Sequence, residues 1–169
     1  FRGACVILDP RNGDVLAMAS VPSYDPNLFI PAIRKADWQE LLKDTEKPMI
    51  NRAIQGSYSP GSTFKVVVAL AGLESGMTND KTNFECPGSF SLGPIIFKCW
   101  NTGGHGDMRL RDAITMSCNV YFYNLGLKLG GPKLWAMSEA FGLGQKTGIQ
   151  LDHEEPGILP TEAWKKSIN

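Results

Sequence analysis

The sequence predicts a mixed α/β (α+β) fold that starts with a β-hairpin and continues as a mostly helical subdomain. Two strand-like segments, over residues 4–9 and 15–19, flank a turn cluster with an Asn-Gly step. Apolar segments of helical length then occur between glycines and prolines. The length of 169 residues corresponds to about one domain. Hydrophobic residues at 43% and charged residues at 20% are typical of a globular chain and argue against bulk disorder.

Helical patterns follow the hairpin. Asp37 as an N-cap, with Glu40 three residues later, predicts a short helix over residues 37–43. A Ser-Pro-Gly turn precedes residues 62–74, which are almost wholly apolar after Lys65, so a buried helix is expected there. Further helices are expected over residues 109–116, 120–129 and 133–141.

Two stretches are expected to contain little regular structure. Residues 82–106 are rich in Gly and Pro, and a loop of that length is uncommon unless something ties it down. Residues 145–169 are expected to be mostly loop. We find no internal repeat.

Charge and hydropathy exclude two classes of partner. Lys plus Arg is 17 and Asp plus Glu is 17, so nothing indicates a nucleic-acid-binding surface. The longest strongly apolar run covers residues 66–73, whereas a transmembrane helix needs about 20 residues. The chain starts with Phe1 and enters strand-like sequence at once, so we expect a piece of a longer protein.

Ser62 and Lys65 form a Ser-x-x-Lys motif at the start of the expected buried helix. Residues three apart share a helix face, so the hydroxyl and the amine can meet. A serine hydroxyl needs a base, and a lysine serves as one when desolvation or a nearby cation lowers its pKa. The motif alone is weak, because Ser62 could instead cap the helix while Lys65 faces solvent.

The surrounding sequence resembles the penicillin-binding transpeptidases. Pro-Gly-Ser-Thr-Phe-Lys at residues 60–65 resembles their active-site segment, with Asn51-Arg52-Ala53 upstream. Ser117-Cys118-Asn119 matches their second motif, Ser-x-Asn, and the hairpin matches the start of the domain. The resemblance covers nearly the whole chain. It implies the penicillin-binding protein/serine β-lactamase-like fold, with residues 1–169 a partial transpeptidase domain.

By that resemblance, the parent is a class B peptidoglycan D,D-transpeptidase. Ser62 would attack the penultimate D-Ala carbonyl of a D-Ala-D-Ala stem peptide, and Lys65 would take the serine proton. Ser117 would relay a proton to the leaving amine, and Asn119 would position Lys65 and a substrate amide. β-Lactams would acylate the same serine. The resemblance also implies an N-terminal membrane anchor outside this chain, a periplasmic location and membership of a cell-wall elongation complex.

The third motif of the family is Lys-Ser/Thr-Gly on a strand. Lys146-Thr147-Gly148 matches it in residue type but not in its surroundings. Its surroundings resemble a loop that these enzymes carry well before the true motif, and no strand-like segment follows. We therefore expect the chain to lack the third motif and to be inactive by itself. Other interpretations are a serine β-lactamase, a β-lactam-sensing receptor domain, or, for this chain alone, an inactive zinc-binding fragment.

Cys86, Cys99, His105 and Cys118 are separated by gaps of 13, 6 and 13 residues. Thiolates and an imidazole are typical ligands of a closed zinc site, but disulfides or free thiols fit this spacing as well. Some members of the penicillin-binding protein 2 group carry a zinc beside the cleft, on ligands at matching positions. The resemblance therefore implies a structural Zn²⁺ on these four residues, with cysteines where some relatives have acidic ligands. Cys5 has no assigned role, and His153 is expected to be a solvated surface residue.

Overall fold

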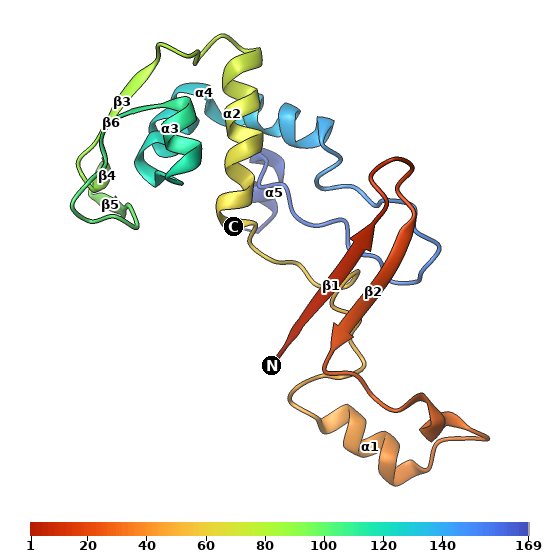
Figure 1. The fold of residues 1–169 in the computed structure, drawn as a ribbon. Helices are drawn as coiled ribbons and strands as arrows, with labels where there is room; N and C mark the ends of the chain where they lie inside the picture. Colours follow the sequence, from red (N-terminus) through yellow and green to blue (C-terminus); the bar gives the residue numbers. More distant parts are fainter. Residues whose placement is uncertain (169) are drawn as a thin grey trace. The chain divides into compact units, whose positions relative to one another are not determined.

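The computed structural model describes residues 1–168. Asn169, at the end of the segment expected to be mostly loop, lies outside the described residues. The chain forms two compact units (Figure 1). The first contains residues 1–58 and 148–155, and the second contains residues 59–147 and the described part of residues 156–169.

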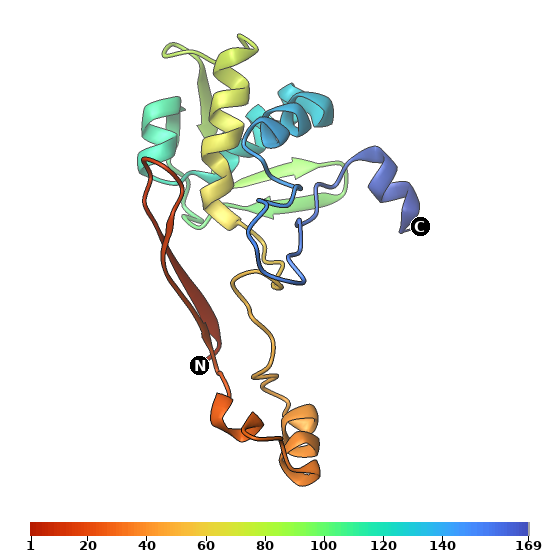
Figure 2. The ribbon, with the colours of Figure 1, turned by 90° about the vertical axis from the view of Figure 1, so that its right-hand side faces the viewer.

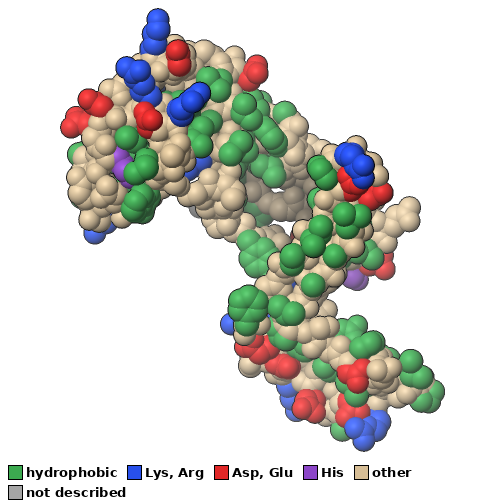
Figure 3. Space-filling model, in the orientation of Figure 1, with side chains coloured by type: hydrophobic (Ala, Val, Ile, Leu, Met, Phe, Trp, Pro, Cys, Tyr) green, Lys and Arg blue, Asp and Glu red, His purple; other side chains and the backbone are tan. Residues whose placement is uncertain are grey.

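The first unit starts with the predicted antiparallel hairpin of β1 (Gly3–Leu8) and β2 (Val15–Val21). A turn closed by the Asp9 amide, which donates to the Asp14 carbonyl at 2.8 Å, joins the strands. Gly13 has a φ of 83°, which the Asn-Gly step supplies without steric cost. Apolar side chains line the exposed surface of this hairpin (Figure 3), among them Val6, Ile7, Leu8, Val15 and Leu16.

The rest of the first unit is a short 3₁₀ turn, η1 (Pro26–Phe29), and a helix, α1 (Lys35–Lys43). The predicted helix is present, but its predicted cap is wrong. Arg34 occupies the N-cap, and Asp37 lies in the first turn, where its carboxylate accepts from the Arg34 guanidinium at 2.7 Å. Arg52 is buried and donates to the carbonyl of Lys47 at 3.3 Å, so it organises the loop after α1.

The second unit holds the helical subdomain and two small antiparallel sheets, β3 with β6 and β4 with β5. Its elements in chain order are η2 (Gly61–Phe64), α2 (Lys65–Glu74), β3 (Asn83–Cys86), β4 (Ser89–Leu92), β5 (Ile95–Lys98), β6 (Gly106–Arg109), α3 (Leu110–Thr115), α4 (Asn119–Ala140) and α5 (Glu162–Ser167). The expectation of little regular structure over residues 82–106 was therefore wrong, because cross-strand pairing supplies order that the local sequence does not show.

Two predicted boundaries also differ. The expected helix over residues 62–74 starts as a 3₁₀ turn, and α-helical geometry begins at Lys65. The two helices expected over residues 120–129 and 133–141 form α4, interrupted where Gly130 has a φ of 73° just before Pro132. The break falls where the missing amide of proline and the conformational freedom of glycine both oppose a continuous helix.

The core of the second unit lies where α2 packs against α4 (Figures 1 and 2). Gly72 on α2 allows the close approach, since a Cβ there would lie 2.8 Å from Thr78 and 3.0 Å from Leu125. Thr78 and Tyr121 are buried and their hydroxyls are 2.8 Å apart, so the polar groups in this core satisfy one another. No helix among residues 1–168 has the length and apolarity to cross a membrane.

Candidate active site and metal centre

The N-terminal end of α2 presents Ser62 and Lys65. Gly61 has a φ of 56°, which turns the chain into the 3₁₀ segment, and the Thr63 hydroxyl donates to the Pro60 carbonyl at 2.6 Å. This tight turn leaves Ser62 exposed and makes Lys65 the first α-helical residue, half-buried against the core. The apolar residues that follow Lys65 in α2 include the buried Val67, Val68 and Ala69.

The second motif lies between α3 and α4. Ser117 follows α3 with a φ of 49°, and Asn119 is the first residue of α4. The amide of Ser117 donates to Ile114 at 3.1 Å and that of Cys118 donates to Ala113 at 2.9 Å. These two bonds form a Schellman motif, in which a left-handed residue ends a helix. Serine occupies the place that glycine usually takes.

The two motifs meet through the Lys65 amine. Its Nζ donates to Asn119 Oδ1 at 2.7 Å, to the Ser117 carbonyl at 2.7 Å and to Ser117 Oγ at 3.0 Å. Ser117 Oγ in turn donates to Ser62 Oγ at 3.2 Å. The three acceptors match the three protons of the ammonium group. A hydrogen-bonded path therefore runs from Ser62 through Ser117 to Lys65.

Burial lowers the pKa of Lys65, although the nearby thiols of Cys118 and Cys99 act in the opposite direction. A lowered pKa increases the population of the neutral amine, which is the form that can accept a proton. Both polar atoms of the Asn119 side chain are hydrogen-bonded. Its Oδ1 accepts from Lys65, and its Nδ2 donates to the Lys98 carbonyl on β5 at 3.3 Å. The site thus brings together two serine hydroxyls, a partly desolvated lysine amine and an asparagine amide.

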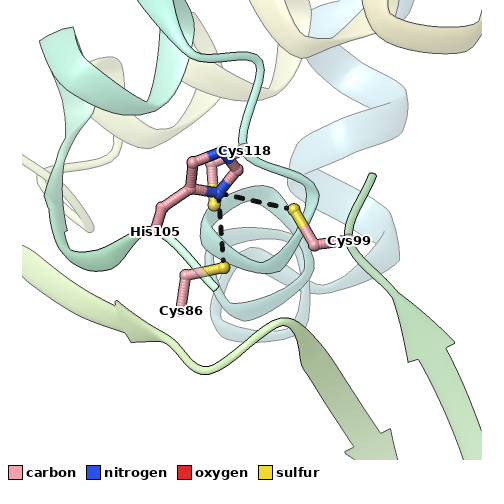
Figure 4. A group of neighbouring side chains, drawn as sticks. All are labelled: Cys86, Cys99, His105 and Cys118. Carbon is pink, nitrogen blue, oxygen red and sulfur yellow. Dashed lines mark hydrogen bonds between the residues drawn. The ribbon is translucent and has the colours of Figure 1, made fainter. Parts of the chain in front are cut away.

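A second cluster of side chains lies next to this site (Figure 4). Cys86 ends β3, Cys99 follows β5, His105 precedes β6, and Cys118 is the N-cap of α4. Their ligand atoms all lie within 4.8 Å of one another. Figure 4 shows Nδ1 of His105 facing the sulfurs of Cys86 and Cys99, at 3.5 Å from each.

Backbone pairing fixes three of these residues. The register of β3 and β6 places Cys86 opposite Gly106, and the His105 amide donates to the Cys86 carbonyl at 2.9 Å. The Cys99 amide donates to Gly88 at 2.9 Å. A side chain at Gly88 would place a Cβ 2.2 Å from the Thr102 carbonyl oxygen, so the backbones approach too closely for any other residue. The loops are built around the cluster.

The distances from His105 Nδ1 to the sulfurs of Cys86 and Cys99 fit those expected around a tetrahedral zinc ion. Bonds of about 2.3 Å to sulfur and about 2.0 Å to nitrogen place a sulfur and a nitrogen ligand about 3.5 Å apart, which is the separation in the structure. All four cysteines of the chain are free, and the three in this cluster are buried. Burial raises the pKa of Cys118 to about 11. Cys99 is also buried, but the backbone amides of Asn119, Asn101 and Val120 lower its pKa.

The structure brings all eight predicted site residues into one region of the second unit. Lys146-Thr147-Gly148 lies outside any strand, and Cys5 and His153 are exposed. Two further contributors carry no signal in the sequence: the carbonyl of Lys98 and the indole of Trp100, whose Nε1 donates to the Met116 carbonyl at 2.9 Å. Both act through contacts between segments that are distant in the sequence.

Comparison with known proteins identifies relatives along the whole chain. The sequence model of the penicillin binding protein transpeptidase domain matches residues 3–169. The peptidoglycan D,D-transpeptidase MrdA of Acinetobacter baumannii is 42% identical over 166 residues, which cover 97% of this chain and 25% of that protein. MrdA of Escherichia coli K12 is 39% identical over 167 residues, which cover 98% of this chain and 26% of that protein. The chain therefore spans about a quarter of these curated relatives.

Solved structures show the same fold. PBP2 of Pseudomonas aeruginosa, in complex with WCK 5153, superimposes with a TM-score of 0.91 at 41% identity, over 99% of this chain and 38% of that chain. PBP2 of Helicobacter pylori gives a TM-score of 0.92 at 37% identity, over 98% of this chain and 32% of that chain. The mixed helix and strand architecture is thus that of a transpeptidase fold.

Proposed function

Because the chain belongs to the penicillin-binding protein transpeptidase domain family, we propose that Ser62 is the acylated serine of a peptidoglycan D,D-transpeptidase. The observation that carries this proposal is the path from Ser62 Oγ through Ser117 Oγ to Lys65 Nζ, closed by Asn119. A nucleophile, a base and an orienting group in mutual contact are what acyl transfer by a serine requires.

In the first half-reaction, neutral Lys65 takes the proton of Ser62 through the Ser117 hydroxyl. Ser62 Oγ bonds to the penultimate D-Ala carbonyl carbon of a stem peptide, and the bond from that carbon to the terminal D-Ala nitrogen breaks. The proton held by Lys65 passes through Ser117 to the leaving amine. In the second half-reaction an acceptor amine attacks the ester carbonyl carbon, and the bond from that carbon to Ser62 Oγ breaks. The new amide bond is the cross-link, and Ser62 regains its proton from the amine. A β-lactam would acylate Ser62 by the same first step.

The relatives support a proposal about partners and location. One solved structure is described as a complex between H. pylori PBP2 and MreC. We propose that the full-length protein likewise works in a cell-wall elongation complex, anchored at the membrane with its catalytic domain in the periplasm.

The test of Ser62 is covalent labelling by fluorescent penicillin in the full-length protein, followed by mass spectrometry of the labelled peptide. Ser62→Ala should abolish labelling, and Lys65→Ala should slow it by roughly 10⁴-fold. The matched control is Ser59→Ala, three residues earlier in the loop that leads to the 3₁₀ turn, which should label normally. An adduct on Ser57, Ser59 or Ser117 would contradict the assignment.

The lifetime of the acyl-enzyme separates the competing activities. A transpeptidase should retain the penicilloyl group for long periods and should transfer a stem-peptide acyl group to an added acceptor amine. A β-lactamase would hydrolyse the penicilloyl ester rapidly, and a sensor domain would retain it without any transfer. Rapid hydrolysis or absence of transfer would therefore exclude the transpeptidase.

Cys86, Cys99, His105 and Cys118 would hold a structural zinc ion beside this site. Four protein ligands leave no open position for water, so the metal would supply a cross-link and no catalytic chemistry. Through Cys118, the cross-link would join the β3–β6 region to the residue between Ser117 and Asn119. The cluster therefore supports the alignment of both residues with Lys65.

Elemental analysis tests this site. We expect about one zinc per chain, and lower zinc content and stability in Cys118→Ser and His105→Ala. Cys5→Ser and His153→Ala, which change the exposed cysteine and histidine, should keep their zinc. If no zinc is found, and Cys86, Cys99 and Cys118 are disulfide-bonded or freely reactive, the proposed zinc site does not exist and the cysteines are thiols or disulfides.

A further inference from the structure

We infer that Trp100 is a positioning residue for the proposed acylation, acting through the peptide bond between Met116 and Ser117. This inference rests on the proposed function of Ser62 and Ser117. Trp100 lies directly after Cys99, outside both catalytic motifs. Its Nε1 donates to the Met116 carbonyl at 2.9 Å.

The conformation of Ser117 needs external support. Its φ of 49° is left-handed, which costs an L-residue other than glycine free energy. This conformation presents both Ser117 O and Ser117 Oγ to Lys65 Nζ, at 2.7 and 3.0 Å. If Ser117 relaxed to a right-handed or extended conformation, these two contacts could not both persist. The relay therefore depends on a backbone state that serine by itself disfavours.

Trp100 fixes the carbonyl group of the peptide unit between Met116 and Ser117, whose orientation sets this φ. The Ser117 amide, on the same peptide unit, donates to Ile114 at 3.1 Å as part of the Schellman motif. Met116 occupies the C-cap of α3, where a carbonyl has no partner within the helix. The indole of Trp100 supplies that partner. Both polar groups of the peptide unit before Ser117 are thus fixed.

The indole is placed for this role by the neighbouring cluster. Its ring contacts the His105 ring, with centroids 5.2 Å apart and planes at 65°. Trp100 is 62% exposed, so burial in the core does not explain its position. His105 Nε2 is buried and has no hydrogen-bond partner among the described residues, so the Trp100 ring and the sulfurs orient this imidazole. Trp100 therefore links the proposed ligand loop to the relay serine.

The experiment measures the acylation rate constant and the dissociation constant of a chromogenic β-lactam separately, by stopped flow, in the full-length protein. Two variants remove the indole N–H: Trp100→Phe, and incorporation of benzothienylalanine at position 100, which keeps the ring shape. A single neutral hydrogen bond corresponds to a rate change of about two- to tenfold. We expect both variants to acylate more slowly by that factor, with unchanged β-lactam affinity and zinc content, and to remain fully folded at the assay temperature. Trp38→Phe, which changes a tryptophan of the first unit, is the control and should leave the rate unchanged.

Three outcomes would overturn the inference. Wild-type acylation rates in both variants would show that the hydrogen bond does not support the relay. A weaker β-lactam affinity at an unchanged acylation rate constant would make Trp100 a substrate contact. A lower melting temperature or zinc content that accounts for the rate loss would make its role structural. Failure of Ser62 to become labelled in the wild type would instead refute the proposed function, so the two failures are distinguishable.

Discussion

Gly72→Ala should separate α2 from α4 and thereby disturb the active site. The added Cβ would lie 2.8 Å from the Thr78 methyl group and 3.0 Å from a Leu125 methyl group. Neither neighbour can give way easily. Leu125 is fully buried, and the Thr78 side chain is held by its hydroxyl contact with Tyr121 at 2.8 Å. The helices must therefore move apart or the side chains must adopt strained rotamers.

The magnitude follows from two opposing terms. Overpacking a well-packed core costs about 1–3 kcal/mol. Replacing glycine by alanine inside a helix gains about 1 kcal/mol through helix propensity. Gly126→Ala on α4 is the matched control, because a Cβ there meets nothing within 4 Å and only the gain applies. The two variants should therefore differ in unfolding free energy by about 1–3 kcal/mol, with Gly72→Ala the less stable.

Thermal unfolding of the whole chain, followed by circular dichroism, measures this difference. For a unit of about 100 residues, 1 kcal/mol corresponds to a shift of about 4–8 °C in melting temperature. Gly72→Ala should therefore melt at least about 4 °C below Gly126→Ala. Lys65 precedes Gly72 by about two helical turns, so Gly72→Ala should also slow penicillin labelling in the full-length protein. Equal melting temperatures would refute the packing argument.

Three further predictions concern the base, the core and the chain alone. Because burial lowers the pKa of Lys65 from 10.5, the acylation rate should rise with pH as Lys65 loses its proton, and the midpoint of this rise should lie below 10.5. Lys65→Arg, which stays charged, should abolish the rise. A midpoint at or above 10.5 would contradict the role of burial. Thr78→Val should lower the free energy of unfolding, measured in urea, by about 1–3 kcal/mol, because it leaves the Tyr121 hydroxyl unpaired. The double variant Thr78→Val with Tyr121→Phe should lose less stability. Additive losses would show that the two residues are not coupled. The 169-residue chain alone should label weakly with fluorescent penicillin, because it spans about a quarter of the length of its curated relatives. Labelling comparable to that of the full-length protein would contradict this expectation.

The sequence alone determined the elements with strong local signals. The Asn-Gly step and flanking strands specified the hairpin, and the continuous apolar stretch after Lys65 specified a buried helix. The two motifs, in order, also identified the family, because they are short contiguous strings whose chemistry depends on residue type. The fold class and family predicted from these features are confirmed by the comparisons.

Only the tertiary structure decided how the site is held together. Four short strands over residues 83–109 escaped prediction, because their stability comes from pairing across the chain and not from alternation within each strand. The left-handed conformation of Ser117 and its support by Trp100 were equally hidden, since a serine and a tryptophan carry no local signal for either. Propensity and periodicity report contacts between neighbours in sequence. The path from Ser62 to Lys65 instead runs through Ser117, which lies more than fifty residues from both in the sequence, and only the packing of α2 against α4 brings Ser117 between them.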